Sequence, residues 1–103
     1  MLHILVTMMI KEGRMQEFLA VCEELRPQVL QEKGCLAYDY TREVPSPLGI
    51  QEPLEPNRIT LIERWESLDA LKAHMEAPHM KKAAARLKDL RASVTARVLE
   101  SAF

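Results

Sequence analysis

The chain has 103 residues, which suits a single domain with a modest hydrophobic core. Its formal net charge is −1, and its basic residues are spread along helical faces rather than gathered with aromatic residues, so we expect no nucleic-acid partner. The amino terminus lacks the basic region of a signal peptide, and no apolar run reaches the length of a membrane span, so we expect a cytoplasmic protein.

The first predicted element is a strand from Leu2 to Ile10. Apolar residues occupy both sides of this strand, as is typical of a strand that is covered on two faces. A helix follows after Gly13, with a kink expected at Pro27 and an end at Gly34. Its apolar residues recur at helical spacing: Met15, Phe18, Leu19, Cys22, Leu25 and Val29. We interpret Cys22 and Cys35 as small buried thiols in a reducing compartment.

Two further strands are predicted at Cys35 to Arg42 and Arg58 to Trp65, separated by the long segment Glu43 to Asn57. The earlier strand places Leu36, Tyr38 and Tyr40 on one face. Loops as long as the connecting segment are usually functional or disordered. Four prolines lower the entropy cost of holding this one ordered over a pocket.

The strand from Arg58 to Trp65 and the segment after it form the most informative part of the chain. Ile59, Leu61, Glu63 and Trp65 share one side, so a carboxylate and an indole point toward the same core. Ser67 is a helix N-cap, and Pro78 ends that helix and begins the next. The first of these helices carries a stripe of Leu68, Leu71 and Met75 with His74 beside it. The second is amphipathic from Met80 to Leu90, and a last strand runs from Ser93 to Leu99.

This order of elements, without a glycine-rich phosphate loop, predicts one domain over residues 1–103. The predicted fold is a ferredoxin-like α+β sandwich, βαββαβ, with a four-stranded antiparallel sheet and helices on one face. The other face would expose apolar side chains in a monomer. We therefore expect a homodimer in which two sheets pack face to face, a dimeric α+β barrel. Trp65 and His74 would converge in a pocket between sheet and helices.

These same residues carry a family resemblance. Glu63–Ser67, then Ala70-Leu71, His74 and Pro78–Lys81, resemble the signature of the antibiotic biosynthesis monooxygenase family of dimeric α+β barrels, and the order of elements agrees over almost the whole chain. Segments before the second strand resemble the bacterial quinol monooxygenase branch: Val29-Leu30, Glu32, Gly34-Cys35 and Tyr38. The resemblance implies an enzyme, a cofactor-independent monooxygenase that oxidises a quinol or similar dihydroxy-aromatic with molecular oxygen, without flavin, haem or metal.

Such chemistry needs an aromatic or apolar slot, a proton acceptor that works near neutral pH and a group that stabilises an oxyanion. We expect Trp65 to form the slot and His74 or His79 to be the base, with Glu63 as an alternative base or as a partner of a histidine. Tyr38 or Tyr40 would orient a phenolic oxygen. Leu61 and Leu71 complete the expected substrate-binding set. The aromatic polyketide monooxygenases of the family have an Asn and a Tyr at these two positions, so the resemblance disfavours a polyketide substrate.

Other functions known on this fold are alternatives to quinol oxidation. Haem-degrading relatives differ at Val6 or Thr7, His74 and Ala84, which disfavours haem chemistry. A branch that isomerises a small phosphorylated signalling ketone shares a histidine followed by a Pro-His pair, as at His74 and Pro78-His79. A non-catalytic dimeric domain that binds a small molecule is the third possibility. We expect no metal, because the spacing of His3, His74 and His79 matches no common zinc pattern.

Overall fold

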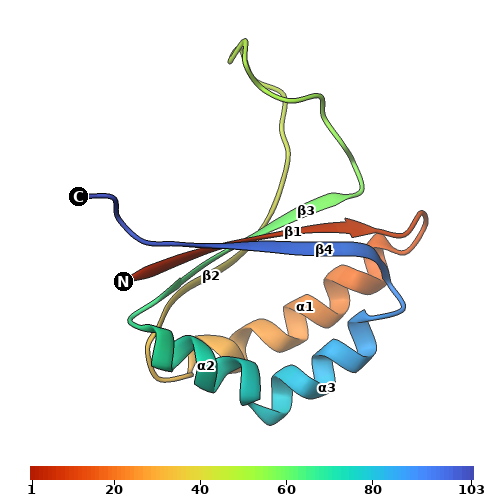
Figure 1. The fold of residues 1–103 in the computed structure, drawn as a ribbon. Helices are drawn as coiled ribbons and strands as arrows, with labels where there is room; N and C mark the ends of the chain where they lie inside the picture. Colours follow the sequence, from red (N-terminus) through yellow and green to blue (C-terminus); the bar gives the residue numbers. More distant parts are fainter.

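The computed structural model describes residues 1–103 and contains seven elements in chain order (Figure 1). The strands form one sheet, and the helices lie together on one face of it. No helix is long and apolar enough to cross a membrane. The elements are β1 (Leu2–Ile10), α1 (Met15–Leu30), β2 (Cys35–Arg42), β3 (Arg58–Trp65), α2 (Leu68–Glu76), α3 (Pro78–Leu87) and β4 (Arg91–Leu99).

The strand order β2-β3-β1-β4, with every neighbouring pair antiparallel, confirms the predicted ferredoxin-like α+β fold. The register places Ile4 of β1 opposite Glu63 of β3, and Met8 opposite Ile59. β3 therefore runs along the middle of the sheet. Its inward side chains are buried as the alternation predicts: Ile59, Leu61, Glu63 and Trp65.

The sequence placed α2 correctly but misjudged its buried face. Ser67 is the N-cap and accepts a hydrogen bond from the amide of Ala70, as predicted. The stripe of Leu68 and Met75, however, faces outward, with 60% and 65% of each residue exposed. His74 is the one buried residue of the helix. The helix turns its His74 side toward β3, where the His74 ring packs against that of Trp65.

Leu36 also departs from expectation, because it does not share the buried face of Tyr38. The register between β2 and β3 shifts between Cys35 and Ala37, so Leu36 is the extra residue of a β-bulge and is 45% exposed. Tyr38 lies opposite Glu63 and is buried. The bulge therefore sets which side chains of β2 enter the core.

Gly34 brings the turn after α1 against the start of α2. Its φ of +86° lies in the left-handed region, and a Cβ at this position would lie 2.6 Å from the Cβ of Ala70. The Gly34 carbonyl accepts a hydrogen bond from the amide of Glu66 at 2.9 Å. This close approach fixes where the preceding turn residues lie relative to α2 and α3.

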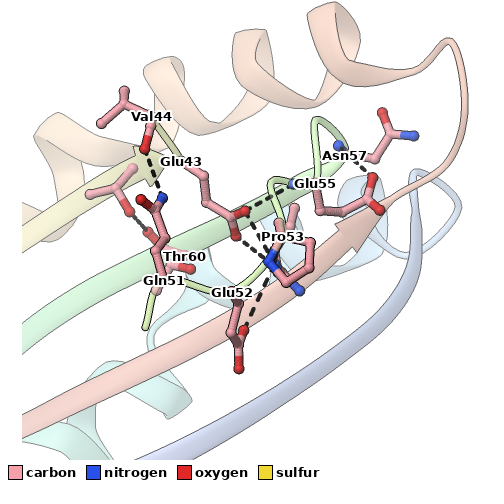
Figure 2. Close-up of polar contacts among 10 residues, drawn as sticks. Glu43, Val44, Gln51, Glu52, Pro53, Glu55, Asn57 and Thr60 are labelled. Carbon is pink, nitrogen blue, oxygen red and sulfur yellow. Dashed lines mark hydrogen bonds and ion pairs between the residues drawn. The ribbon is translucent and has the colours of Figure 1, made fainter. Parts of the chain in front are cut away.

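The proline-rich segment 43–57 rises from the sheet on the side away from the helices (Figure 1). Figure 2 shows how its base is closed: Glu43 pairs with Arg58 and accepts a hydrogen bond from the amide of Glu55 at 2.9 Å. Gln51 donates to the carbonyl of Val44 at 2.8 Å. The segment is held in shape, but it projects away from the space between sheet and helices that we expected it to cover.

The helix-free side of the sheet, here called the open face, carries Leu5, Met9, Ile62 and Leu99. Ile62 is 38% exposed and Leu99 is 39% exposed. The projecting segment adds four exposed aliphatic residues on the same side: Val44, Leu48, Ile50 and Leu54. A surface of this kind is typical of a protein-protein contact.

We expect the open face and segment 43–57 to pack against a second copy of the chain. Light scattering should report twice the 11.8 kDa mass of one chain at micromolar concentration. Ile62→Glu should shift the protein toward the monomer, because it places a charge in an interface that must exceed about 1,000 Å² to be specific.

The control is Met75→Glu, which adds the same charge at an exposed apolar residue on the helix side. A wild-type protein that scatters as an 11.8 kDa monomer would contradict the dimer.

Candidate functional site

A cavity of about 140 Å³ lies between the sheet and the helices. Every helix and strand contributes a side chain to it, so the cavity depends on the whole fold. Most of the lining residues are apolar, and the others contribute imidazole, carboxyl, phenol and guanidinium groups. The lining residues are Val6, Met8, Leu25, Tyr38, Tyr40, Leu61, Glu63, His74, Met80, Ala84, Leu87 and Arg91.

The structure brings five of the eight predicted site residues to this cavity: His74, Glu63, Tyr38, Tyr40 and Leu61. The other three, Trp65, His79 and Leu71, are not among the lining residues. Leu71 is partly buried and packs against the core. His79 lines a separate surface depression between α1 and α3.

Trp65 lies behind the cavity wall rather than on it. The residue is 0% exposed, and its ring lies 4.5 Å from the His74 ring, centroid to centroid, at an interplanar angle of 37°. Its indole Nε1 donates a hydrogen bond to Glu63 Oε1 at 2.9 Å. In this chain Trp65 therefore supports the two ionisable side chains that reach the cavity.

His74 is oriented by Glu32, which lies in the turn after α1. The His74 Nδ1 atom lies 2.9 Å and 3.1 Å from the two carboxylate oxygens of Glu32. A carboxylate only accepts hydrogen bonds, so Nδ1 carries the proton in the neutral ring. The Nε2 lone pair then points away from Glu32 and is free to accept a proton, which is the arrangement of a general base.

His79 contacts the same carboxylate, at the oxygen Oε2 that also lies closest to His74. Its Nε2 atom lies 2.7 Å from Glu32 Oε2, and its side chain is 23% exposed whereas that of His74 is 5% exposed. Glu32 thus joins a buried imidazole on α2 to a more exposed imidazole on α3. The structure places His79 next to the candidate base rather than next to the cavity.

Glu63 is a buried carboxyl close to the free nitrogen of His74. Its Oε1 atom lies 3.9 Å from His74 Nε2, which is too long for a hydrogen bond. Burial is the main cause that raises the pKa of Glu63, while Trp65 and His74 act in the opposite direction. Glu63 is consequently a second group in the site that favours holding a proton.

Tyr38 and Tyr40 supply hydroxyl groups to the same cavity. Their rings pack edge to face at 5.5 Å, and the Tyr38 ring lies 5.6 Å from that of His74. Burial raises the pKa of both phenols. Both therefore keep their protons at neutral pH and act as hydrogen-bond donors, which suits an oxyanion.

Sequence reasoning assigned no role in the site to Glu32 or Arg91. Glu32 is 42 residues from its partner His74, so no local spacing could signal the contact. Arg91 begins β4 directly after the buried Leu90, whereas the sequence patterns predict a strand only from Ser93. No group of three or more His, Cys, Asp or Glu side chains is arranged to hold a metal ion.

Comparisons with known proteins agree with this fold. A family model described as "Antibiotic biosynthesis monooxygenase" matches residues 1–86. The "Probable quinol monooxygenase YgiN" of Escherichia coli K12 is 41% identical over 56 residues, which are 53% of this chain and 52% of that protein. The chain therefore spans about half the length of the curated relatives that it matches.

Solved structures match over nearly the full chain. The "Putative antibiotic biosynthesis monooxygenase from Nitrosomonas europaea" has a TM-score of 0.85 at 17% identity and full coverage of both chains. A protein of the same description from Caulobacter crescentus has a TM-score of 0.83 at 26% identity, covering 99% of this chain and 90% of that one. At 17% identity, the similarity to the Nitrosomonas europaea protein shows the fold alone.

The raised pKa of Glu63 predicts a pH-dependent stability. Its ordinary pKa is 4.5, so below pH 4.5 the carboxyl is protonated in both the folded and unfolded states. As the pH rises from 4.5 through the raised pKa, the unfolded state ionises first and the folded state loses stability. The free energy of unfolding of wild type minus that of Glu63→Gln should therefore fall over this range, by up to about 1.4 kcal/mol per pH unit.

Urea denaturation of both proteins at a series of pH values measures this difference. Trp65, His74 and Glu32 are the groups that influence Glu63, so the series is repeated with His74→Gln in both backgrounds to remove the contribution of that ring. Linkage predicts the change over roughly pH 4 to 7. If the difference in unfolding free energy between wild type and Glu63→Gln stays constant over this range, burial does not raise the pKa of Glu63.

Proposed function

Because the chain belongs to the antibiotic biosynthesis monooxygenase family, we propose that it oxidises a quinol or a similar dihydroxy-aromatic compound with molecular oxygen and without a cofactor. The observation that carries the proposal is the His74 imidazole, whose Nε2 is left free by the contact of Nδ1 with Glu32. His74 lines a mostly apolar cavity together with two phenols, those of Tyr38 and Tyr40.

The first step is removal of a proton from a substrate hydroxyl. His74 Nε2 accepts that proton, and the carboxylate of Glu32 stabilises the imidazolium that forms, as in other base-carboxylate pairs. Tyr38 or Tyr40 donates a hydrogen bond to the resulting oxyanion. The buried carboxyl of Glu63 lies next to the same nitrogen and is the second proton acceptor in the site.

The substrate anion supplies the electrons to oxygen. One oxygen atom enters the ring to give a hydroxyquinone, and the other leaves as water with the two hydroxyl hydrogens of the quinol. The balance closes with no further reductant. The mostly apolar lining reduces the contact of the anion with water.

The cavity volume favours a small aromatic substrate. At about 140 Å³ it is close to the roughly 150 Å³ of an apolar cavity that accepts benzene. A single dihydroxylated ring fits this space, and a larger substrate would have to extend through the mouth of the cavity.

Two free cysteines support our placing the reaction in the cytoplasm, where thiols stay reduced.

A second candidate function is supported by one observation. An isomerase of a small phosphorylated ketone needs a cation in its pocket, and Arg91 lines this cavity. The same site would then use His74 to move a proton on the ketone rather than to ionise a phenol. Oxygen separates the two candidates, because isomerisation consumes none.

The direct test is oxygen uptake by purified protein with one-ring and two-ring hydroquinones in the presence of a chelator. We expect a colourless protein that accelerates oxygen uptake with no cofactor added. His74→Ala should lower kcat by about 10² to 10⁴, the usual range for a general base, with little change in KM. Activity that appears only after flavin or metal is supplied would contradict the proposal.

Two variants make the assignment sharper. His3→Gln alters a histidine of β1 that does not line the cavity and should leave kcat unchanged. Trp65→Phe keeps a ring against His74 but removes the donor to Glu63, so it should fold and should retain more activity than His74→Ala. An unchanged kcat in His74→Ala would instead assign the proton transfer to His79 or Glu63.

A further inference from the structure

Arg91 extends its side chain from the beginning of β4 into the cavity. It pairs with Ile10 of β1, and its guanidinium Nη1 lies 3.7 Å from the sulfur of Met8, a residue that is only 2% exposed. Arg91 itself is half-buried, so its guanidinium borders the apolar layer between sheet and helices. Arg91 and His74 line the same cavity.

No carboxylate neutralises this cation. Arg91 takes part in none of the ion pairs of the structure, which are Arg14–Glu17, Arg26–Asp39, Arg58–Glu43, Arg58–Glu52, His74–Glu32, His74–Glu63, His79–Glu32 and Arg86–Glu24. Its one recorded contact is with a thioether sulfur, which is a weak acceptor. The five donors of the guanidinium thus have capacity for a ligand.

The only carboxyl group in the cavity lining, Glu63, lies toward the other end. Glu63 is opposite Ile4, whereas Arg91 contacts Met8, four residues further along β1. At about 3.3 Å per residue these positions are roughly 13 Å apart along the strand. The cavity therefore has a proton-accepting end at His74 and Glu63 and a cationic end at Arg91.

We propose that Arg91 forms an anion subsite, so that the substrate is a hydroxylated aromatic compound with a carboxylate or similar anionic group on the side away from the reacting hydroxyl. This assignment rests on the proposed function for the aromatic part of the substrate. A half-buried guanidinium at a mostly apolar cavity favours a carboxylate, because the carboxylate satisfies its hydrogen-bond donors and its charge together. A neutral substituent would leave the same cation unpaired.

Equilibrium binding tests the subsite without oxidation. The probes are 3-(4-hydroxyphenyl)propionate and its uncharged amide, which carry a single hydroxyl and are titrated into wild-type protein by calorimetry. A hydrogen bond to a charged group contributes about 1.5 to 3 kcal/mol, so the acid should bind about 10-fold to 100-fold more tightly than the amide. Arg91→Gln should remove this preference and Arg91→Lys should keep part of it.

Arg86→Gln is the matched control. Arg86 lies on α3 with its guanidinium paired to Glu24 outside the cavity, so its loss should leave the preference for the acid intact. Melting curves by circular dichroism establish that each variant is folded. If Arg91→Gln does not fold, Arg91→Lys and the wild-type comparison of acid with amide decide the question.

Equal affinity of the wild-type protein for acid and amide would overturn the subsite, as would a preference that persists in folded Arg91→Gln. Glycerone phosphate is titrated in parallel as a non-aromatic anion. If glycerone phosphate binds in a way that depends on Arg91 and the aromatic acid does not bind, the aromatic assignment is overturned in favour of a phosphorylated ketone.

Failure of the subsite and failure of the proposed oxidation give different results. The subsite fails and the oxidation stands if two results are found together. Wild type and Arg91→Gln take up oxygen equally with uncharged methylhydroquinone, and the wild-type protein shows no preference for the acid over the amide. An Arg91-dependent preference for the acid without oxygen uptake from any hydroquinone keeps the subsite and removes the oxidation.

Discussion

The arrangement of the candidate site depends on one carboxylate, that of Glu32, which contacts His74 and His79 at 2.9 Å and 2.7 Å. It links the turn after α1 to both α2 and α3. Gly34 makes this link possible, because a side chain there would collide with Ala70. Without Glu32, the two imidazoles would lose their hydrogen-bond partner. Neither ring nitrogen of His74 would then be fixed as the proton acceptor.

The antiparallel register then gives the cavity its two chemically different ends. β1 and β3 place Glu63 near His74, and the beginning of β4 places Arg91 near Met8. The apolar residues between them exclude water and strengthen each electrostatic contact. The fold therefore brings the proposed proton acceptor and the proposed anion-binding group to one small space. The open face of the sheet remains available for association with a second copy.

Much of the fold was predictable because it follows local patterns. The alternation in β3, the N-cap at Ser67 and Pro78 at the start of α3 each depend on near neighbours. The bulge at Leu36 and the outward face of Leu68 depend on contacts with other elements, and local patterning misjudged both. In the site, the type of residue at His74 was informative, but its partner Glu32 is 42 residues away and could be found only from the structure.

We propose that Glu32 holds His74 with the proton on Nδ1, which leaves Nε2 free to accept a proton. Nitrogen-15 NMR of the imidazole side chains distinguishes the two neutral tautomers directly. We expect neutral His74 to be the Nδ1–H tautomer in the wild-type protein, and Glu32→Gln to weaken this preference. A neutral His74 with its proton on Nε2 would rule out the proposed base, because Nε2 could not then accept a proton from a substrate.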